Sequence, residues 1–387
     1  MQSWPEGRCL RALADVSQRA GNEMRTLRVG IPNDAGVELF DALLTVVTHN
    51  ASTLKELELV GTCSRDATEV TARILRAGSA LESLIVEHLV VGRHIDLTQL
   101  TALLSGDGLY KPLRVHWLDI KFMVLEDDDD ALPQMTQDDD DALLRSISQH
   151  RSLRKFSIST GDDIRFDVDL ACAAASAGAL DFILRADDDD MDDITREVAR
   201  LVTGFPIHKL ELHQDADTET EFDDAFLAAV RDSRSLQTLI IFGSVFYDTY
   251  TSLFEAVRGH PTISTLGVHG AVFLTERAVM FASIASLLTV PSALTRLDLE
   301  KAGPMDIEAV QTLLGGLASP NCRLQELVLS EFTDDDEVDE MTPLFISNTM
   351  APAVLACQSM RSVVYDHYDE MVKDAIEHLN ALLRYRQ

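Results

Sequence analysis

Residues 53–59 read Thr-Leu-Lys-Glu-Leu-Glu-Leu, and the spacing of their leucines is the clearest structural signal in the chain. Leu54, Leu57 and Leu59 follow the spacing L-x-x-L-x-L. The spacing recurs strictly at Leu294/Leu297/Leu299 and Leu324/Leu327/Leu329, and more loosely at Met24/Leu27/Val29, Leu81/Leu84/Val86, Val115/Leu118/Ile120, Leu153/Phe156/Ile158, Ile207/Leu210/Leu212, Leu236/Leu239/Ile241, Ile263/Leu266/Val268, Met360/Val363/Tyr365 and, in degraded form, near Leu180/Ile183. About twelve units at a mean period of roughly 30 residues predict a solenoid.

The apolar pattern within a unit predicts one strand followed by one helix. Leu57 and Leu59 are two residues apart and so lie on one face of a strand, opposite Glu56 and Glu58. Segments with apolar residues at helical spacing follow several frames, at residues 66–77, 190–202 and 221–230. Repetition of this unit gives a curved parallel sheet with helices on its convex side, in which each unit covers the apolar face of its neighbour.

The repeats resemble leucine-rich repeats, and the long period with a helix in each unit resembles the ribonuclease-inhibitor-like class. The resemblance covers residues 23–387 and implies an α/β horseshoe with a parallel concave sheet and convex helices. The family places Asn or Cys three residues after each frame, to satisfy loop backbone. This chain has other residues there, which indicates divergent turns: Pro32, Thr62, Asp215, Ser244, Ala302 and Phe332.

The expected organisation is one continuous repeat domain over residues 23–387, because no Pro/Gly/Ser-rich linker interrupts the frames. Both ends of a solenoid need a cover for their apolar core. Residues 1–22 are expected to form an N-terminal helical cap. Residues 369–385 place Val372, Ile376, Leu379 and Leu383 on one helical face and are expected to cap the other end.

Composition narrows the class of protein. No apolar run approaches the ~20 residues of a membrane span, and residues 1–10 do not resemble a signal peptide. The five cysteines are widely dispersed, which favours free thiols in a reducing compartment. The chain is expected to be a monomer in the cytoplasm or nucleus. Nucleic acid is not expected as a partner, because phosphate binding needs clustered Lys/Arg, which this chain of net charge −31 lacks.

The acidic residues are concentrated in five runs, at 126–130, 138–141, 187–193, 215–224 and 334–340. Each is expected after a strand and at or before the start of the next helix, where aspartate caps helices and is favoured by the helix dipole. Three roles stay open: solvated loops, docking of a basic protein, and weak calcium binding. The rim residues expected to contact a partner are Asp127, Asp128, Asp129, Asp130, Asp138, Asp139, Asp140, Asp141, Asp187, Asp188, Asp189, Asp190, Asp192 and Asp193.

The concave face is the second predicted contact surface. Residues that alternate with core leucines face it, and those expected to contact a partner are Glu211, His213, Ile240, Phe242 and His269. An exposed Ile and Phe on an open sheet face favour a contact site. The two imidazoles would lie two strands apart, at ~10 Å, too far to share one metal ion. His49, His150 and His260 follow helices and are interpreted as structural cations at C-terminal dipole ends.

No catalytic motif is found: the nucleophile elbow, the phosphate-binding loops and the H-E-x-x-H zinc motif are all missing. The sequence therefore predicts a non-enzymatic protein-interaction scaffold with a basic protein partner, no cofactor, no metal and no catalytic residue. The family resemblance leaves two alternatives, a regulator of a GTPase and a substrate-receptor adaptor.

Overall fold

The structure is a computed structural model that describes residues 24–31, 37–63, 73–74, 77, 83–91, 97–105, 113–121, 137–159, 164–186, 191–214, 222–243, 247–269, 277–299, 307–330, 342–366 and 369–386. The N-terminal cap predicted over residues 1–22 lies outside these ranges. The chain divides into two compact units, Met1–Asp181 (unit 1) and Phe182–Gln387 (unit 2), and each is described by itself.

Strands alternate with helices along the described residues, and the twelve strands form a parallel sheet in sequence order. Unit 1 contains β1 (Thr26–Ile31), α2 (Val37–His49), β2 (Glu56–Cys63), β3 (Ser83–Val91), α4 (Leu97–Ser105), β4 (Leu113–Lys121), α5 (Gln137–Gln149), β5 (Lys155–Ser159) and α6 (Ile164–Ala177). The predicted α/β fold with a parallel sheet and one strand per repeat is confirmed.

Unit 2 continues the same alternation. Its elements are β6 (Asp181–Ala186), α7 (Met191–Gly204), β7 (Lys209–Gln214), α8 (Asp224–Asp232), β8 (Thr238–Phe242), α9 (Tyr247–Val257), β9 (Thr265–His269), α10 (Arg277–Leu288), β10 (Arg296–Leu299), α11 (Ile307–Leu317), β11 (Glu326–Ser330), α12 (Pro343–Phe345), the π-helical turn η1 (Ile346–Met350), α13 (Ala351–Ala356), β12 (Ser362–Asp366) and α14 (Glu370–Arg386).

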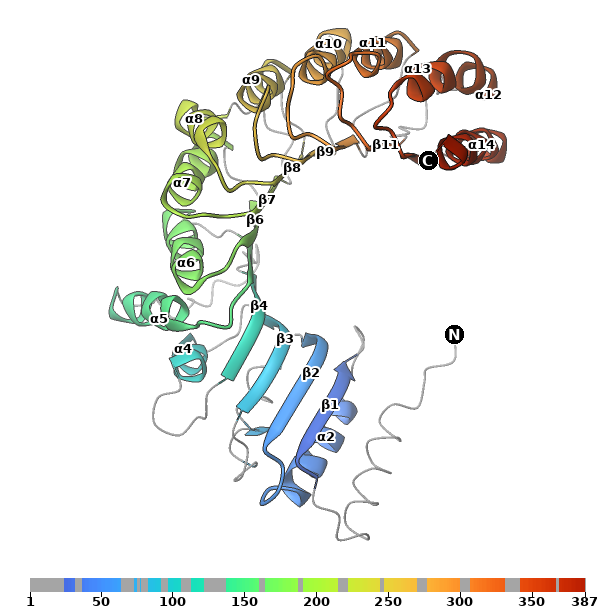
Figure 1. Ribbon diagram of the computed structural model, residues 1–387. Coiled ribbons are helices and arrows are strands. Elements are labelled where there is room, and N and C mark those ends of the chain that lie inside the picture. Colours follow the sequence, from blue (N-terminus) through green and yellow to red (C-terminus); the bar gives the residue numbers. More distant parts are fainter. Residues whose placement is uncertain are drawn as a thin grey trace, which may run out of the picture. The chain divides into compact units, whose positions relative to one another are not determined.

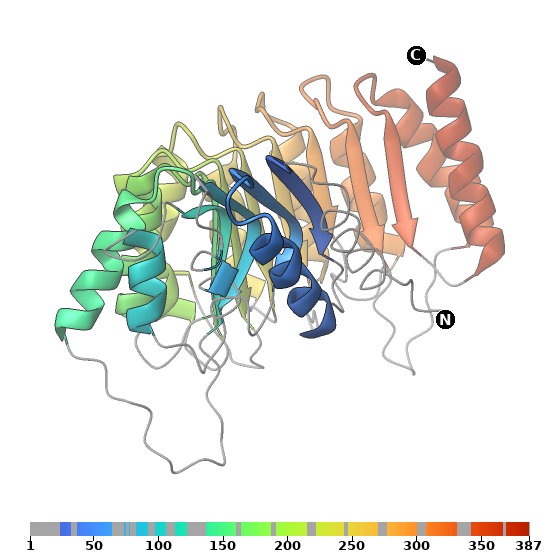
Figure 2. The same cartoon turned by 90° about the horizontal axis from the view of Figure 1, so that it is seen from below.

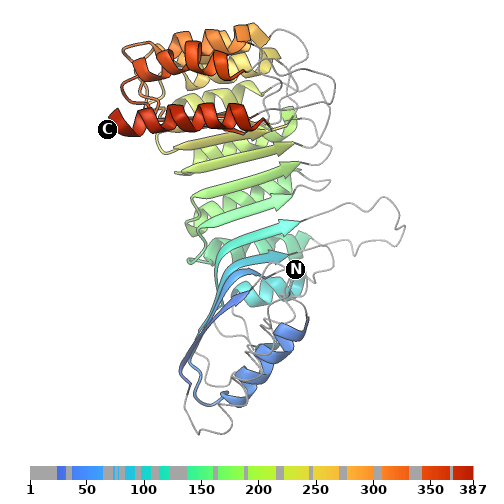
Figure 3. The ribbon, with the colours of Figure 1, turned by 90° about the vertical axis from the view of Figure 1, so that its right-hand side faces the viewer.

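The helices of unit 2 cover one face of its strands. Helices α7 to α11 all lie on the same side of β7 to β11 (Figure 1). The strands run side by side in one direction, with these helices behind them (Figure 2, Figure 3). No described element of unit 2 covers the opposite face of β7 to β11, which we call the open face.

The predicted leucine frames form the core. In unit 2 the last two residues of each strictly or loosely matching frame are at most 6 % exposed, from Leu210 and Leu212 to Val363 and Tyr365. The register keeps them in rows, since Leu239 is paired with Leu210 on one side and Leu266 on the other. Burial of one such side chain stabilises the fold by ~1.5–3 kcal/mol, so the rows are the main source of cohesion.

One backbone carbonyl joins each repeat of unit 2 to the next. The carbonyl of His208, just before β7, accepts hydrogen bonds from the N–H groups of Gln237 (2.8 Å) and Thr238 (3.0 Å), which enter β8. Corresponding carbonyls accept two N–H groups each in the following repeats, namely those of Gln237, Ser264, Thr295 and Gln325. Backbone polar groups at the strand entrances are therefore satisfied by the neighbouring repeat.

The degraded repeat exists, but its predicted frame is wrong by one residue. The carbonyl of Arg154 accepts the N–H groups of Leu180 and Asp181, and Asp181 directly precedes Phe182. By analogy with the other repeats, the core residues are Phe182 and Leu184, which are 0 % and 2 % exposed. Leu180, expected in the frame, is half-buried and lies before the strand.

His150 and His260 stabilise the connections between helices and strands, as neutral side chains. His260 donates from Nε2 to the carbonyl of Val230 (3.0 Å), and its Nδ1 accepts the N–H of Ile263 (3.1 Å). His150 Nε2 accepts the N–H of Val115 (2.9 Å). Burial lowers the pKa of both imidazoles. The structural role is therefore confirmed, but the predicted cationic state is wrong because desolvation penalises the charged ring.

Helix α14 covers the C-terminal edge of unit 2. Its buried side chains are the four that the spacing predicts, Val372, Ile376, Leu379 and Leu383. Asn380 pairs with the backbone of Val363 in β12, accepting from its N–H (2.8 Å) and donating to its carbonyl (2.7 Å). The guanidinium of Arg386 donates to the carbonyls of Leu355, Cys357 and Met360 at 2.6, 3.0 and 2.7 Å.

Candidate functional site

The acidic rim residues that the structure describes lie in helices. Asp138–Asp141 fall in the first turns of α5, and Asp192 and Asp193 in the first turn of α7. Asp138–Asp141 were expected directly before a helix at Ala142, but α5 already starts at Gln137. Asp192 and Asp193 lie in the segment 190–202 whose apolar spacing predicts a helix, and α7 starts at Met191. Carboxylates are favoured there by unpaired N–H groups and the helix dipole. Asp127–Asp130 and Asp187–Asp190 lie outside the described residues.

Capping is observed directly at one of the other acidic runs. Asp223 is the N-cap of α8, and its Oδ1 accepts the N–H of Ala225 at 2.7 Å. Its second carboxylate oxygen lies 3.4 Å from Nε of Arg196. The capping role, one of the interpretations that the sequence left open, therefore applies to this residue.

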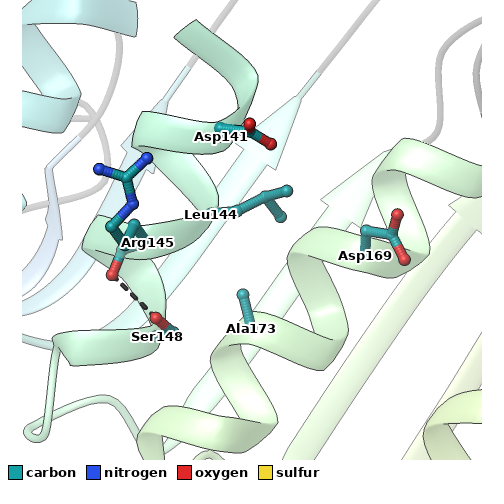
Figure 4. A pocket seen from close by; sticks show the side chains of 6 residues that line it. All are labelled: Asp141, Leu144, Arg145, Ser148, Asp169 and Ala173. Carbon is teal, nitrogen blue, oxygen red and sulfur yellow. Dashed lines mark hydrogen bonds between the residues drawn. The ribbon is translucent and has the colours of Figure 1, made fainter. Parts of the chain in front are cut away.

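A shallow groove lies between α5 and α6 of unit 1 (Figure 4). Leu144 and Ala173 point into it from the two helices, and Asp141 and Asp169 lie at its end (Figure 4). Arg145 points away, and Ser148 donates to the carbonyl of Arg145 at 2.8 Å. The groove combines an apolar floor with two carboxylates, so the acidic run of α5 borders a surface depression.

The open face of unit 2 brings the predicted concave-face residues together. The register pairs Glu211 with Ile240 and His213 with Phe242, and on the next strand it pairs Phe242 with His269. Ile240 and Phe242 are half-buried. Gly267 faces Ile240, and a Cβ on it would lie 2.8 Å from Ile240 Cγ2. The missing side chain at this glycine is therefore what allows Ile240 to lie over β9.

Phe242 is the centre of a three-ring cluster. The His213 imidazole stacks on its ring with centroids 3.9 Å apart and planes at 13°. The His269 imidazole meets it edge-on, with centroids 4.4 Å apart and planes at 81°. Both geometries are favourable for aromatic rings. The two imidazoles thus contact one phenyl ring from different sides, and the rings of His213 and Phe242 are half-exposed.

Two carboxylates border the cluster, one on each side. Glu211 contacts Lys209 Nζ and, at 3.4 Å, His213 Nε2. Burial opposes ionisation of Glu211, but hydrogen bonds from His213 and Lys209 outweigh it and lower its pKa to about 2. Asp298 likewise loses solvation, yet hydrogen bonds from His269 and Arg296 hold its pKa below the ordinary value. Both side chains are therefore anionic at neutral pH.

His269 and Asp298 form a buried pair. His269 Nε2 lies 3.1 Å from Asp298 Oδ1, and the side chains are 9 % and 8 % exposed. Neither atom makes a well-aligned hydrogen bond to any of the described residues. Arg296 bridges Asp298 and Glu326 at 2.8 Å each. His269 was expected on an exposed surface; it is buried instead, because the phenyl ring and Asp298 enclose it.

Unit 1 carries a smaller aromatic contact on its own sheet. Trp117 of β4 donates from Nε1 to Ser157 Oγ of β5 at 2.7 Å. Lys155 Nζ lies 3.6 Å from the centre of the indole ring, a cation–π distance. These three residues were not among the predicted contact residues, and they are not part of the cluster in unit 2.

Arg296, Asp298 and Glu326 were also not predicted as neighbours of the concave face. The signal was present, because these residues alternate with the core leucines Leu297 and Leu327. The alternation identifies the face, but it does not reveal that Asp298 reaches back to the imidazole of the preceding strand.

Two kinds of site are not found in the part of the chain that the structure describes. No three His, Cys, Asp or Glu side chains there are placed to hold a metal ion. No helix in those ranges combines the length and apolarity needed to cross a bilayer. Comparison with models of known protein families and with curated proteins finds no match to this chain.

Replacing Glu211 with glutamine is expected to cost about 1 kcal/mol of unfolding free energy at pH 7, because charge-assisted hydrogen bonds to Lys209 and His213 become weaker. A pKa of about 2 means that this contribution is complete above the ordinary value of 4.5 and is lost as pH falls toward 2. Urea unfolding at pH 7, 4 and 2.5 measures it. A constant difference between variant and wild type across this range would contradict the assignment.

Proposed function

We propose that this chain is a non-enzymatic protein-interaction scaffold of the leucine-rich-repeat type, which binds a protein with a basic surface through the open face of unit 2. The observation that carries the proposal is the half-exposed cluster of Ile240, His213 and Phe242 on an uncovered sheet face. Monomeric proteins leave few ordered apolar groups of this kind without use, and aromatic residues are enriched where partners bind.

Charge complementarity supports a basic partner. The chain has a net charge of −31, so it attracts a cationic protein from a distance and repels an acidic one. Glu211 beside the aromatic cluster, and Glu326 on β11, have partly exposed carboxylates. We assign long-range attraction to the acidic runs and short-range specificity to the open face.

These two contributions predict different responses to substitution. Phe242→Ala removes a central, rigid contact, and we expect it to weaken binding by at least tenfold through faster dissociation. Asp138–Asp141→Asn removes charges that are not part of the open face, and we expect slower association and a weaker salt dependence with little change in dissociation. Surface plasmon resonance at 50 and 300 mM salt separates the two rates.

The experiment begins with affinity capture on wild-type chain at 50 mM salt, followed by reconstitution with the purified candidate partner. Val364→Thr is the matched control, since Val364 is 43 % exposed on β12 and lies outside the cluster. Circular dichroism of each variant checks that it is folded. A reconstituted partner that is acidic, or that binds Phe242→Ala as tightly as wild type, would refute this assignment.

A further inference from the structure

Cys322 and Cys357 bring two thiols together near the end of unit 2. Cys322 follows α11, and Cys357 is the C-cap of α13. Their Sγ atoms lie 3.6 Å apart. Cys357 is 3 % exposed, whereas Cys322 is half-buried. The two residues belong to consecutive connections between helix and strand, so a bond between them would join neighbouring repeats.

The surroundings distinguish the two sulfurs. Cys357 Sγ lies 3.3 Å from Ser359 Oγ, and the Arg386 guanidinium donates to the Cys357 carbonyl at 3.0 Å. The contact with Cys322 lowers the pKa of Cys357 to about 5, against the effect of burial and with help from Ser359. The same contact, together with burial, raises the pKa of Cys322. The surroundings therefore favour the thiolate form at Cys357 over Cys322.

A depression lined by Gln358, Ser359, Met360 and Arg386 borders the connection that carries Cys357. Ser359 contacts both the depression and the sulfur. The thiolate is the reactive form of cysteine toward peroxides, and a second thiol within reach converts the first oxidation product into a disulfide.

We propose that Cys322 and Cys357 are a peroxide-sensitive pair, with Cys357 as the oxidised residue and Cys322 as the resolving residue. In the first step the Cys357 thiolate attacks one oxygen of hydrogen peroxide. An S–O bond forms, the O–O bond breaks, and hydroxide leaves, so Cys357 becomes a sulfenic acid.

In the second step the sulfur of Cys322 attacks the Cys357 sulfur. The S–S bond forms as the S–O bond breaks, and the departing oxygen takes the proton of Cys322 to leave as water. The two sulfurs together give up two electrons to one peroxide. The product is a covalent link between the β11 repeat and the final repeat.

Peptide mapping of the full chain tests the proposal. Trypsin cleaves after Arg323 and Arg361, so Cys322 and Cys357 fall in separate peptides, 302–323 and 324–361. After treatment with equimolar hydrogen peroxide at pH 7 and blocking of free thiols, we expect these two peptides to be joined, with loss of two hydrogens. The unfolding temperature should also rise by several degrees in the oxidised chain.

Three variants assign the roles. Cys322→Ser should accumulate a sulfenic acid on Cys357 that dimedone traps, and Cys357→Ser should slow oxidation of Cys322 by at least tenfold. Cys172→Ser, which removes a half-buried thiol on α6 of unit 1, is the matched control and should leave the linked peptides unchanged. The pair is ruled out if peroxide oxidises Cys172 while Cys322 and Cys357 stay reduced, or if the linked peptides join other cysteines.

Discussion

Replacing His260 with alanine is expected to cost about 2–4 kcal/mol of unfolding free energy. The substitution leaves the N–H of Ile263 without a partner in a buried connection, at ~1–3 kcal/mol. The carbonyl of Val230 also loses its hydrogen bond from the imidazole and keeps only the N–H of Ser233 at 3.3 Å. Urea unfolding followed by circular dichroism measures the cost. His49→Ala is the matched control, because His49 is exposed at the end of α2 and its Nδ1 bonds to the carbonyl of Thr45, one turn earlier in the same helix. Its effect should stay within about 0.5 kcal/mol.

The same imidazole gives stability a pH dependence of known sign. Burial lowers the folded-state pKa of His260 below its ordinary value of 6.5. As the pH falls below 6.5, the imidazole is protonated in the unfolded chain before it is protonated in the folded chain. The contribution of His260 to the free energy of unfolding is therefore complete above pH 6.5 and is lost as the pH falls through the lower folded-state pKa. The difference between wild type and His260→Asn should shrink between pH 7.5 and 5.5. A difference that grows over this range would show that the ring is charged in the folded chain.

Gly316→Ala and Gly315→Ala are expected to change stability in opposite directions. A Cβ on Gly316 would lie 2.8 Å from the carbonyl oxygen and 2.9 Å from the Cα of Ala285 in α10, so the two helices must move apart. We expect a loss of about 2–3 kcal/mol. A Cβ on Gly315 meets nothing within 4 Å and lies on the exposed side of α11, so alanine should stabilise by about 0.5–1 kcal/mol.

Thermal and urea unfolding of the two variants, beside wild type, test this pair of substitutions. Because both residues are in one helix, helix propensity predicts stabilisation by alanine at each, and only the contact with Ala285 separates them. Equal stabilisation of both variants would mean that α10 and α11 are not in close backbone contact.

The fold was predictable where the pattern of apolar residues admits a single frame. Leu239 and Ile241 are separated by one residue and preceded by Leu236, and all three are fully buried. The pattern failed at β6, where Phe182, Ile183 and Leu184 are consecutive and all buried. An uninterrupted apolar run cannot specify which residues face the core, and backbone hydrogen bonds from the preceding repeat decide the register.

The candidate site was predictable as a face, but not as a set of contacts. Alternation along β7 to β9 places His213, Phe242 and His269 on one side, and equal strand registers bring them together. Burial depends on which side chains enclose a residue, so the sequence could not show that His269 is covered or that His150 and His260 are neutral. The start of α5 was misplaced, at Ala142 and not at Gln137, because aspartate is compatible with both a cap and a first turn.

The contact between Asn380 and Val363 has a consequence for self-association. An outermost strand offers unpaired N–H and carbonyl groups on which another molecule can add a strand, and so begin a polymer. The carboxamide of Asn380 occupies both groups of Val363 in β12, in the manner of a peptide unit from a further strand. The last helix thus protects the molecule against end-to-end growth with one side chain that imitates main chain.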